Sequence, residues 1–423
     1  MAVNLNLLKK NQDDDDENSE NPEQDKPKKE KKDNLEEVQN LLTDEYDFVF
    51  NEITREIIFK EKGSTVFSPF YDENFSDLYI DLKKRKFKIS KDLLHTLIES
   101  KYVSFRKNEI YDYFNALKPI PDENEMKALC ATLKQTGQTN FDQFYILFRR
   151  WLIGCYYCGM GFSANHVCLV LVGGQGIYKS TWLDKLCPPA LSDYGVRTKL
   201  ELSAGNKDTQ NLLVEKFLIN IDDQLAGLFR KDAEAIKTFI TAEKVEVRKA
   251  YTRSNVKRNR IANFVASVNE TNFLSDNENR RYLITEVSLC DIFAKIDINK
   301  VWSEVKFLAT NKKEQGYFTA DEANAQKLIN EYYVENTLES EWLFQIYRPA
   351  IKDDSESQIK YLGANEIIKE LNYHSKVILN PYKVNQAMKR YKFYQVTKRL
   401  PDVGPRKVYP VVLRTEDRIP DSF

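Results

Sequence analysis

The residues best suited to chemistry lie in one short stretch, which reads CLVLVGGQGIYKSTW at positions 168–182. Its apolar first part predicts a buried strand, and Gly173, Gly174 and Gly176 predict a tight turn before a helix. Glycines let backbone N–H groups converge on an anion, and the N-terminus of the helix adds its positive dipole end. The stretch therefore predicts a phosphate-binding loop.

Three side chains at the end of this loop complete the prediction. Lys179 reaches the β- and γ-phosphates of a nucleotide in such loops, and the hydroxyl of Ser180 holds Mg²⁺. Thr181 adds a neighbouring hydroxyl, which we group with the cofactor-binding residues without assigning it a role. The predicted cofactors are ATP and Mg²⁺. The alternative is an ordinary strand–turn–helix connection with a lysine on its surface.

Tyr178 departs from the phosphate-loop pattern, which has glycine immediately before the lysine. That glycine is usually explained by a positive φ. A tyrosine in the same conformation adds strain of roughly 1–2 kcal/mol, which surrounding contacts can absorb. The departure bears on the rate of hydrolysis more than on nucleotide binding.

A pair of carboxylates follows the next strongly apolar run. The segment FLINIDDQ, 217–224, predicts a buried strand that ends in Asp222 and Asp223. Ligands of parallel sheets bind outside the carboxyl ends of the strands. We therefore predict that Asp222 belongs to the Mg²⁺ site and that Asp223 orients or deprotonates the attacking water. A helix cap directly after the strand is the alternative, because aspartate is a good N-cap.

Polar residues also follow a third predicted strand, 263–268. The amide of Asn269 can hydrogen-bond the attacking water or the γ-phosphate without adding charge. Arg280 and Arg281 come shortly afterwards, before another apolar strand. We predict that one of these arginines stabilises the transferring phosphoryl group, on its own or on a neighbouring subunit.

The segment 247–261 predicts a basic β-hairpin with a polar tip at 252–255. Basic side chains with an aromatic between them suit single-stranded nucleic acid, through neutralisation of phosphates and stacking of bases. The predicted nucleic-acid-binding residues are Arg248, Lys249, Tyr251, Arg253, Lys257 and Arg258, and Arg260 is a further basic residue of the segment. A hairpin whose charges are simply solvated is the alternative.

The composition limits the classes of protein to consider. The chain has 423 residues, a net charge of −1 and 30% charged residues, so a basic surface can only be local. No apolar run approaches the roughly 20 residues that span a bilayer, and no signal region precedes the acidic N-terminal stretch. The six cysteines are scattered, with Cys155 and Cys158 in an isolated CxxC pair that we attribute to packing. We expect a cytoplasmic protein without membrane contact.

The predicted fold class is α/β, with a P-loop core between smaller accessory regions. The expected segments are a disordered charged tail at 1–40, a small α+β accessory domain at 41–118 with a hairpin turning near 51–54, a helical region at 119–164, the α/β core at 165–290 and a second helical region at 291–350.

The last segment, 358–423, predicts two helices followed by two strands, which is the order of a winged helix. Ten lysines and arginines but only one acid, Asp402, lie between Lys376 and Arg414. A basic helix with a basic wing is typical of a module that binds duplex or single-stranded DNA. A winged helix that docks on a protein is the alternative.

Six motifs taken together resemble the virulence-associated protein E family of phages, plasmids and mobile islands. The motifs are, in order, GGQGIYKSTW, FLINIDDQ, EAIKTFIT, VRKAYTR, FVASVNETNFLSD and NENRRYLITEV. The resemblance covers about 140–345, and the flanking segments resemble versions from Bacteroidetes mobile elements. It implies a superfamily 3-like, AAA+-related helicase that is tied to replication.

The resemblance also implies roles for single residues. The matches are Lys179 and Ser180 at the Walker A positions, Asp222 and Asp223 at the Walker B acidic pair, Asn269 at the sensor asparagine, and Arg280 and Arg281 in the arginine-finger region. Asp223 stands where glutamate is common in the family, and its shorter reach slows the activation of water. Residues 1–120 contain no acidic triad of the kind that a primase domain uses, so we expect a separate primase as a partner.

The predicted function is that of an ATP-driven DNA helicase or translocase that replicates a mobile element or phage. It is expected to act as a ring, a hexamer, on single-stranded or forked DNA. The alternative is a replication initiator or adaptor that binds nucleotide and DNA but hardly turns nucleotide over, and Tyr178 favours it. A P-loop kinase for small molecules does not account for the basic hairpin or the basic C-terminal segment.

Overall fold

The computed structural model describes residues 34–121, 124–137, 140–198, 207–222, 225–248, 255–274, 280–400 and 404–414. The chain divides into two compact units. The first contains the residues up to Phe50 together with Glu56–Arg106, and the second contains Asn51–Arg55 and the residues from Lys107 onward. Each unit has its own apolar core.

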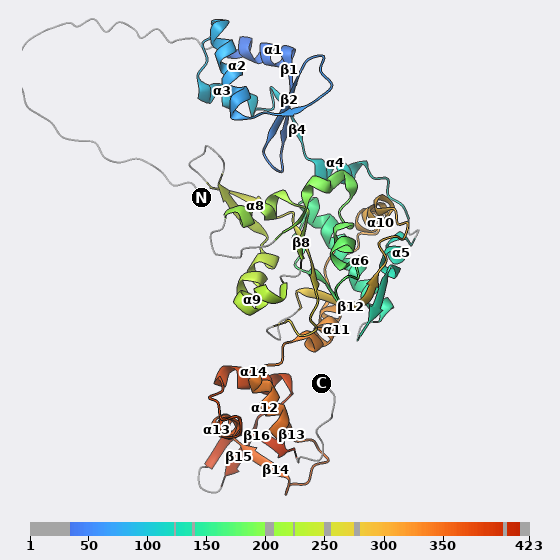
Figure 1. Cartoon of the computed structure of the whole chain (residues 1–423), viewed down its shortest axis with the longest axis vertical. Coiled ribbons are helices and arrows are strands. Elements are labelled where there is room, and N and C mark those ends of the chain that lie inside the picture. Colours follow the sequence, from blue (N-terminus) through green and yellow to red (C-terminus); the bar gives the residue numbers. More distant parts are fainter. Residues whose placement is uncertain are drawn as a thin grey trace, which may run out of the picture. The chain divides into compact units, whose positions relative to one another are not determined.

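Within the described residues, the first unit combines a four-stranded sheet with helices (Figure 1). Its elements are α1 (Leu35–Glu45), β1 (Tyr46–Asn51), β2 (Ile57–Glu61), β3 (Ser68–Pro69), α2 (Asp72–Lys84), α3 (Lys91–Ile98) and β4 (Ser104–Lys107). β1 and β2 pair antiparallel with Phe50 opposite Ile57, which confirms the predicted hairpin.

Helix α1 begins at Leu35, inside the segment 1–40 for which we expected a disordered tail. Val38 and Leu42 lie about one turn apart on α1, and both are fully buried in the core of the first unit. Tertiary packing of these two side chains is what stabilises a helix of this length. The rest of the expected tail, 1–33, lies outside the described residues.

A six-stranded sheet is the centre of the second unit as far as the structure describes it, with the strand order β5-β12-β6-β11-β8-β7. The strands are β5 (Leu133–Thr136), β6 (Cys168–Val172), β7 (Gly195–Arg197), β8 (Leu218–Asp222), β11 (Asn263–Val268) and β12 (Tyr282–Cys290). Neighbouring strands are parallel except β5, which runs antiparallel to β12. Every residue of β6 and β11 is buried, because both faces of a central parallel strand are covered.

Strand β5 lies in the segment 119–164, for which we expected only helices. Helices α5 (Glu125–Ala131) and α6 (Phe141–Gly159) occupy most of that segment, but Leu133–Thr136 pair with the end of β12. The strand has only four residues, of which one, Leu133, is buried. The alternation of apolar and polar residues over so short a segment cannot be distinguished from the end of a helix.

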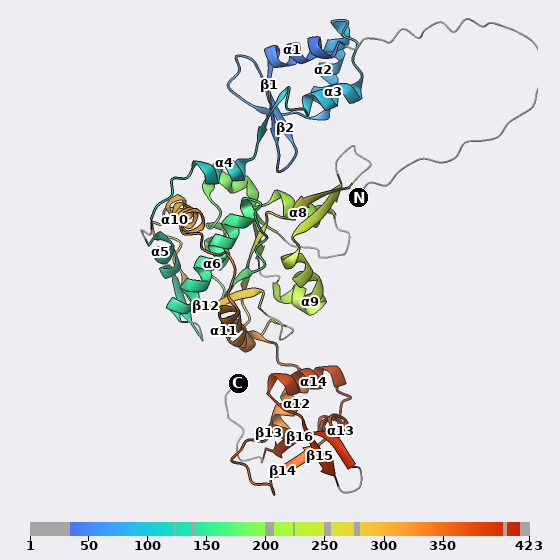
Figure 2. The ribbon, with the colours of Figure 1, turned by 180° about the vertical axis from the view of Figure 1, so that it is seen from behind.

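Helices cover both faces of the sheet, as Figures 1 and 2 show from opposite sides. One face packs against α4 (Glu109–Ala116), α5, α6, α7 (Lys179–Asp184), the 3-10 helix η1 (Pro189–Tyr194) and α10 (Ile298–Thr310). The other face packs against α8 (Lys207–Glu215), α9 (Leu225–Thr241), α11 (Ala320–Asn330) and the 3-10 helix η2 (Glu331–Tyr333). Alternate residues of β6 supply the two cores, Leu169 and Leu171 to the first and Val170 to the second.

Helix α4 belongs to this second unit although it falls in the expected accessory segment 41–118. Ile110 and Phe114 of α4 are fully buried in the same core as α6. The ring of Phe114 meets those of Phe217 and Trp302 edge to face, with centroids 5.6 Å and 5.4 Å away. These contacts explain why the expected segment is divided between the two units.

Strands β9 (Lys244–Arg248) and β10 (Asn255–Asn259) form a separate antiparallel pair, as predicted for this segment. Val245 and Val247 of β9 are buried in the second core, whereas Lys257 of β10 stands opposite Glu246 on the outer side. The tip of the hairpin, 249–254, lies outside the described residues.

Arg260 follows β10 and is buried, with 1% of its surface exposed. Its guanidinium donates hydrogen bonds to the backbone oxygens of Ala262 (3.0 Å) and Asn165 (2.8 Å). Arg260→Ala should therefore lower the free energy of unfolding by about 3 kcal/mol, because it removes two charge-assisted hydrogen bonds from a buried site. Denaturant unfolding measures this. Lys257→Ala is the control and should change stability by less than about 0.5 kcal/mol; equal losses in the two variants would contradict the buried role of Arg260.

The C-terminal part of the chain, in its described residues, places helices against a small antiparallel sheet. Its elements are α12 (Leu338–Ile346), β13 (Tyr347–Pro349), β14 (Ile359–Leu362), α13 (Ala364–Ser375), α14 (Pro381–Arg390), β15 (Val396–Leu400) and β16 (Gly404–Leu413). The order helix–helix–strand–strand from α13 to β16 is the predicted one, and β16 pairs with β13, β14 and β15. None of the helices within the described ranges of the whole chain has both the length and the apolar content that crossing a membrane requires.

Candidate active site

Most of the predicted site residues that the structure describes meet at one edge of the central sheet. Strands β6, β8 and β11 run parallel, with Val268 beside Val172 and Ser267 beside Asp222. Their carboxyl ends therefore lie together, and they carry the glycine-rich loop, Asp222 and Asn269. This is the edge at which α/β sheets bind ligands.

The loop between β6 and α7 has two backbone features that depend on single residues. A Cβ atom at Gly173 would lie 2.3 Å from the backbone oxygen of Val287, so only glycine fits beside β12. Tyr178 has φ 66° and ψ 24°, in the left-handed region that costs an L-residue roughly 1–2 kcal/mol. The positive φ expected immediately before Lys179 is thus confirmed, although the residue is a tyrosine.

The Lys179 side chain lies across the loop, with 6% of the residue's surface exposed. Its Nζ donates hydrogen bonds to the backbone oxygens of Gly173 (2.8 Å) and Gly174 (2.7 Å) and to Oδ1 of Asn269 (2.9 Å). These partners hold the ammonium between the loop and the end of β11. It can therefore present a positive charge to an anion that the loop holds.

A cluster of oxygen atoms lies at the ends of β8 and β11. Oδ1 of Asp222 accepts hydrogen bonds from Oγ of Ser180 and from Oγ of Ser267, the latter at 2.8 Å. The two hydroxyl oxygens are 3.1 Å apart. Carboxylate and hydroxyl oxygens are ligands that Mg²⁺ prefers, so Ser180 and Asp222 suit the metal that accompanies ATP. Ser267 was not among the predicted residues, because it lies inside the apolar run of β11.

Arg197, at the end of β7, is a second site residue that the sequence did not point to. Its Nη1 lies 3.5 Å from Oδ2 of Asp222, and its Nε donates a 3.0 Å hydrogen bond to Oδ2 of Asp184. Asn220 donates to the other oxygen of Asp184 at 2.7 Å. Arg197 therefore balances part of the charge of Asp222. The available signal was a basic residue at the end of a strand, but β7 has only three residues.

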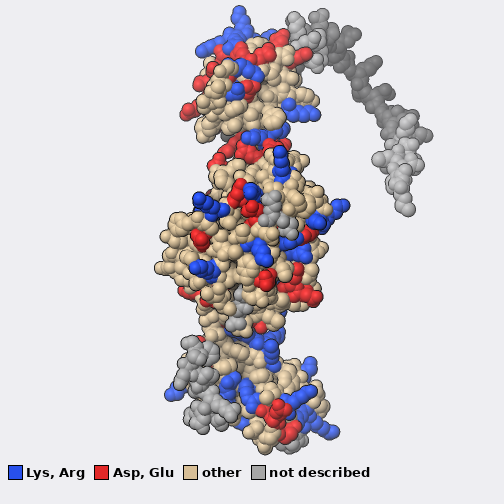
Figure 3. Space-filling model, turned by 90° about the vertical axis from the view of Figure 1, so that its right-hand side faces the viewer, with Lys and Arg blue, Asp and Glu red and all other residues tan. Residues whose placement is uncertain are grey.

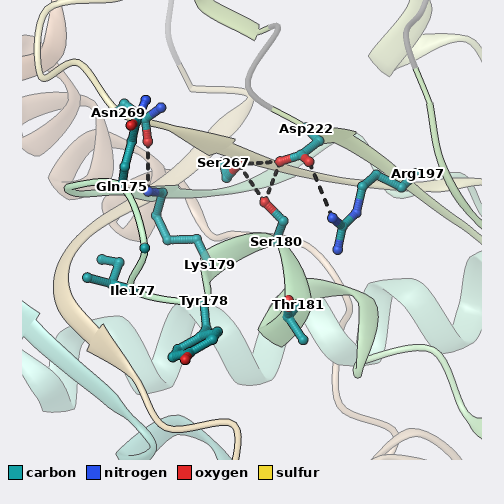
Figure 4. A pocket seen from close by; sticks show the side chains of 11 residues that line it. Gln175, Ile177, Tyr178, Lys179, Ser180, Thr181, Arg197, Asp222, Ser267 and Asn269 are labelled. Carbon is teal, nitrogen blue, oxygen red and sulfur yellow. Dashed lines mark hydrogen bonds and ion pairs between the residues drawn. The ribbon is translucent and has the colours of Figure 1, made fainter.

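These side chains line a pocket of about 270 Å³ (Figure 4). In Figure 4, Lys179 and Asn269 lie on one side of the pocket, and Asp222 and Arg197 lie on the other. Of the predicted site residues, those that line the pocket are Gly176, Lys179, Ser180, Thr181, Asp222 and Asn269. Asp223 lies outside the described residues.

Arg280 and Arg281 do not line this pocket. They precede β12, whose first residue, Tyr282, stands beside Cys168, the first residue of β6. The backbone oxygen of Arg281 accepts a 2.8 Å hydrogen bond from the N–H of Cys168. The two arginines therefore lie at the amino edge of the sheet, opposite the edge that carries the pocket. Arg280 is exposed and Arg281 is half-buried.

The predicted nucleic-acid-binding residues are described only in part. The Lys257 side chain is 70% exposed, and its Nζ lies 3.4 Å from the carboxylate of Glu246 on the paired strand. Arg258 faces the other side of the hairpin, where it donates hydrogen bonds to the backbone oxygens of Glu52 (3.1 Å) and Ile53 (2.8 Å). Of the remaining residues, Arg248 ends β9, and Lys249, Tyr251 and Arg253 lie outside the described part of the chain.

Cys155 and Cys158 are buried on α6, and burial raises the pKa of both thiols. Neutral buried thiols pack as small apolar groups and do not bind metals readily. Among the described residues, no group of three or more His, Cys, Asp or Glu could hold a metal ion. A Mg²⁺ ion that arrives with a nucleotide needs no such group, since one or two carboxylates and the phosphates hold it.

The chain is similar to one protein family and to several solved structures. A family model described as "Virulence-associated protein E-like domain" matches residues 124–335, which is half of the chain. Two apo structures of the C-terminal region (305–718) of NrS-1 are 13% identical to this chain, with a TM-score of 0.47. The matches cover 90% and 91% of this chain and 98% and 100% of the other. The comparison with curated proteins gave no match.

Proposed function

Because the chain belongs to the virulence-associated protein E-like family, whose model matches half of it, we propose that it is an ATP-dependent DNA helicase of the superfamily 3-like, AAA+-related class. Its proposed role is the replication of a phage or other mobile element. It is further proposed to work as a ring, a hexamer, with ATP at the interfaces between subunits and a separate primase as a partner.

The observation that carries the proposal is the convergence of Lys179, Ser180, Asp222 and Asn269 on one pocket at the carboxyl edge of a parallel sheet. An ammonium for phosphate oxygens, a hydroxyl and a carboxylate for Mg²⁺, and an amide for the γ-phosphate or for water are the parts that a P-loop ATPase needs. The chemistry of these side chains fits Mg–ATP. The loop before Lys179 also supports it, since Tyr178 adopts the backbone conformation that the pattern requires.

Each of these residues has a proposed role toward the nucleotide. Bound Mg–ATP would supply the phosphoryl group that is transferred to water. Lys179 would neutralise charge on the phosphate oxygens, and Ser180 and Asp222 would hold the metal. Asn269 would orient the water or the γ-phosphate, and Asp223 would accept a proton from that water.

The test of the proposed function is the rate of ATP hydrolysis with and without single-stranded DNA. A helicase of this class should hydrolyse ATP faster when DNA is present. Intact DNA and nucleotide binding without stimulated turnover would instead favour the second candidate, a replication initiator or adaptor that hardly hydrolyses ATP. The strained backbone at Tyr178 is the observation that favours this candidate.

Two regions are proposed to contact DNA, the β9–β10 hairpin and a winged helix formed by α13, α14, β15 and β16. Acidic and basic side chains are interspersed on the face drawn in Figure 3, so binding depends on local groups of basic residues. On the proposed winged helix, the exposed lysines and arginines are Lys369, Lys376, Lys383, Lys389, Lys392, Arg399 and Lys407. Arg406 and Lys398 instead lie within ion-pair distance of Glu366 and Glu356.

Replacing Arg248, Lys249 and Arg253 by alanine should lower the affinity for single-stranded DNA and flatten its dependence on salt. Each lost phosphate contact should reduce the slope of log K against log salt concentration by about 0.7. Fluorescence anisotropy at several salt concentrations measures this slope. The control replaces Lys84, Lys91 and Lys101, which are exposed on the first unit. If both triple variants keep the wild-type slope, the hairpin does not contact phosphates.

A further inference from the structure

We propose that Tyr178 and Phe293 form a platform on which the base of the bound nucleoside triphosphate stacks. This inference rests on the proposed function, because it requires a nucleotide in the phosphate loop. It gives a role to Tyr178, the loop residue that departs from the phosphate-loop pattern, and it assigns a base-binding site to this chain.

The two aromatic rings contact one another, and one of them belongs to a residue that lines the pocket. Their centroids are 5.9 Å apart and their planes are inclined at 81°. Tyr178 lines the pocket and 47% of its surface is exposed, and 78% of the surface of Phe293 is exposed. An edge-to-face pair with this much exposure leaves ring faces open, and a flat aromatic base can cover such a face. Single exposed apolar side chains are ordinary, but this pair combines mutual contact with a place beside a pocket.

Both rings are carried by backbone that is fixed by its conformation or by hydrogen bonds. Tyr178 is fixed in the left-handed conformation at the end of the loop. The backbone oxygen of Ile177 accepts a 3.1 Å hydrogen bond from the N–H of Cys290, which ties the end of β12 to the loop. Oδ1 of Asp291 then accepts a 3.0 Å hydrogen bond from the N–H of Phe293. Because hydrogen bonds order the backbone that carries the two rings, little backbone conformational entropy is lost when a ligand binds.

The direction of the Tyr178 ring suits a base rather than a phosphate. In Figure 4 the ring points away from the ammonium of Lys179 and the carboxylate of Asp222, on the side of the loop where Thr181 also lies. A triphosphate held by Lys179 and Ser180 must leave its nucleoside end outside the phosphate loop. A neutral phenol ring offers that end a stacking surface but offers a phosphate no positive charge.

The experiment compares the affinities of the wild type, Tyr178→Gly and Phe293→Ala for ATP and for inorganic tripolyphosphate, by calorimetry in the presence of Mg²⁺. Tripolyphosphate carries the phosphates without a base. Loss of either ring should weaken ATP binding about tenfold to a hundredfold. Tripolyphosphate binding should not weaken in Tyr178→Gly, because glycine adopts a positive φ without strain. Tyr178→Phe should bind ATP as the wild type does.

Phe162→Ala is the matched control, because Phe162 is 68% exposed and its ring contacts Tyr157 rather than the loop. This variant should bind both ligands as the wild type does.

Equal losses of affinity for both ligands, or no loss for either, would overturn the platform. A change of oligomeric state without a base-dependent loss would overturn it too, because the rings would then form a contact between copies. Wild-type protein that binds tripolyphosphate as tightly as ATP would exclude the platform while leaving the phosphate site intact. Wild-type protein that binds neither ligand would overturn the proposed function itself and the platform with it.

Discussion

Replacing Lys179 by alanine is expected to weaken ATP binding by about a hundredfold or more and to abolish ATP hydrolysis. The ammonium lies across the phosphate loop, 2.9 Å from the amide oxygen of Asn269, and is almost fully buried. Its charge-assisted hydrogen bonds to phosphate oxygens would each contribute roughly 1.5–3 kcal/mol, and two of them account for the expected loss. Calorimetry with Mg–ATP measures the affinity, and phosphate release measures the turnover.

Lys216→Ala is the control for this substitution. Its Nζ donates a 2.8 Å hydrogen bond to the backbone oxygen of Asp193, so the control removes a similar bond outside the pocket. Thermal unfolding with and without Mg–ATP separates loss of binding from loss of fold. A protein that binds ATP unfolds at a higher temperature in its presence, and Lys179→Ala should lose only this increase. If Lys179→Ala binds and hydrolyses ATP as the wild type does, the proposed ATPase site is wrong.

The central strands could be predicted from apolar runs because they are buried on both faces. β11 occupies the predicted segment, Asn263–Val268, and β8, Leu218–Asp222, lies within the predicted segment 217–224. Parallel strands in the middle of a sheet read as continuous apolar segments. The edge strands β5 and β7 have four and three residues, and neither carries enough of a pattern to predict pairing.

Outside the glycine-rich loop and the start of α7, the site could be predicted only where it depends on the ends of strands. Asp222 and Asn269 are polar residues at the carboxyl ends of apolar runs, and parallel strands bring such residues to one edge. Arg197 meets Asp222 because β7 pairs with β8, with Arg197 beside Asn220 in the register. The sequence does not specify which strands are neighbours, so it cannot predict this contact.

In the β9–β10 hairpin, the register of the two strands places adjacent basic residues on different faces. Lys257 and Arg258 are adjacent basic residues, but Lys257 stands opposite Glu246 on the outer side and Arg258 stands opposite Val245 on the buried side. Opposite residues of an antiparallel pair share a face, and neighbours along a strand do not. Once Val245 is recognised as a core residue, the alternation of side chains between the two faces of the hairpin predicts that Arg258 lies on the inner face.

If Arg280 or Arg281 is the proposed arginine finger, Arg280→Ala or Arg281→Ala is expected to lower turnover by about 10³–10⁵-fold while nucleotide binding remains. Within one chain these residues are badly placed for that role. The backbone oxygen of Arg281 is bonded to the N–H of Cys168 at the start of β6, whereas the loop follows Val172 at its end. The length of this strand separates the two edges by about 13 Å. The proposed ring would bring the arginines of one copy to the pocket of the next.

Mixing two inactive variants tests this arrangement. Lys179→Ala protein keeps its arginines, and the Arg280→Ala/Arg281→Ala double variant keeps its pocket, so each alone should be inactive. In a ring assembled from equal amounts of both, about a quarter of the interfaces pair an intact pocket with an intact arginine, and about a quarter of the activity should return. Native mass spectrometry verifies that mixed rings have formed. An arginine that acts within its own chain gives no recovery of activity at any mixing ratio. Recovery of activity would therefore show that two copies share the pocket. If verified mixed rings stay inactive, a shared pocket is excluded.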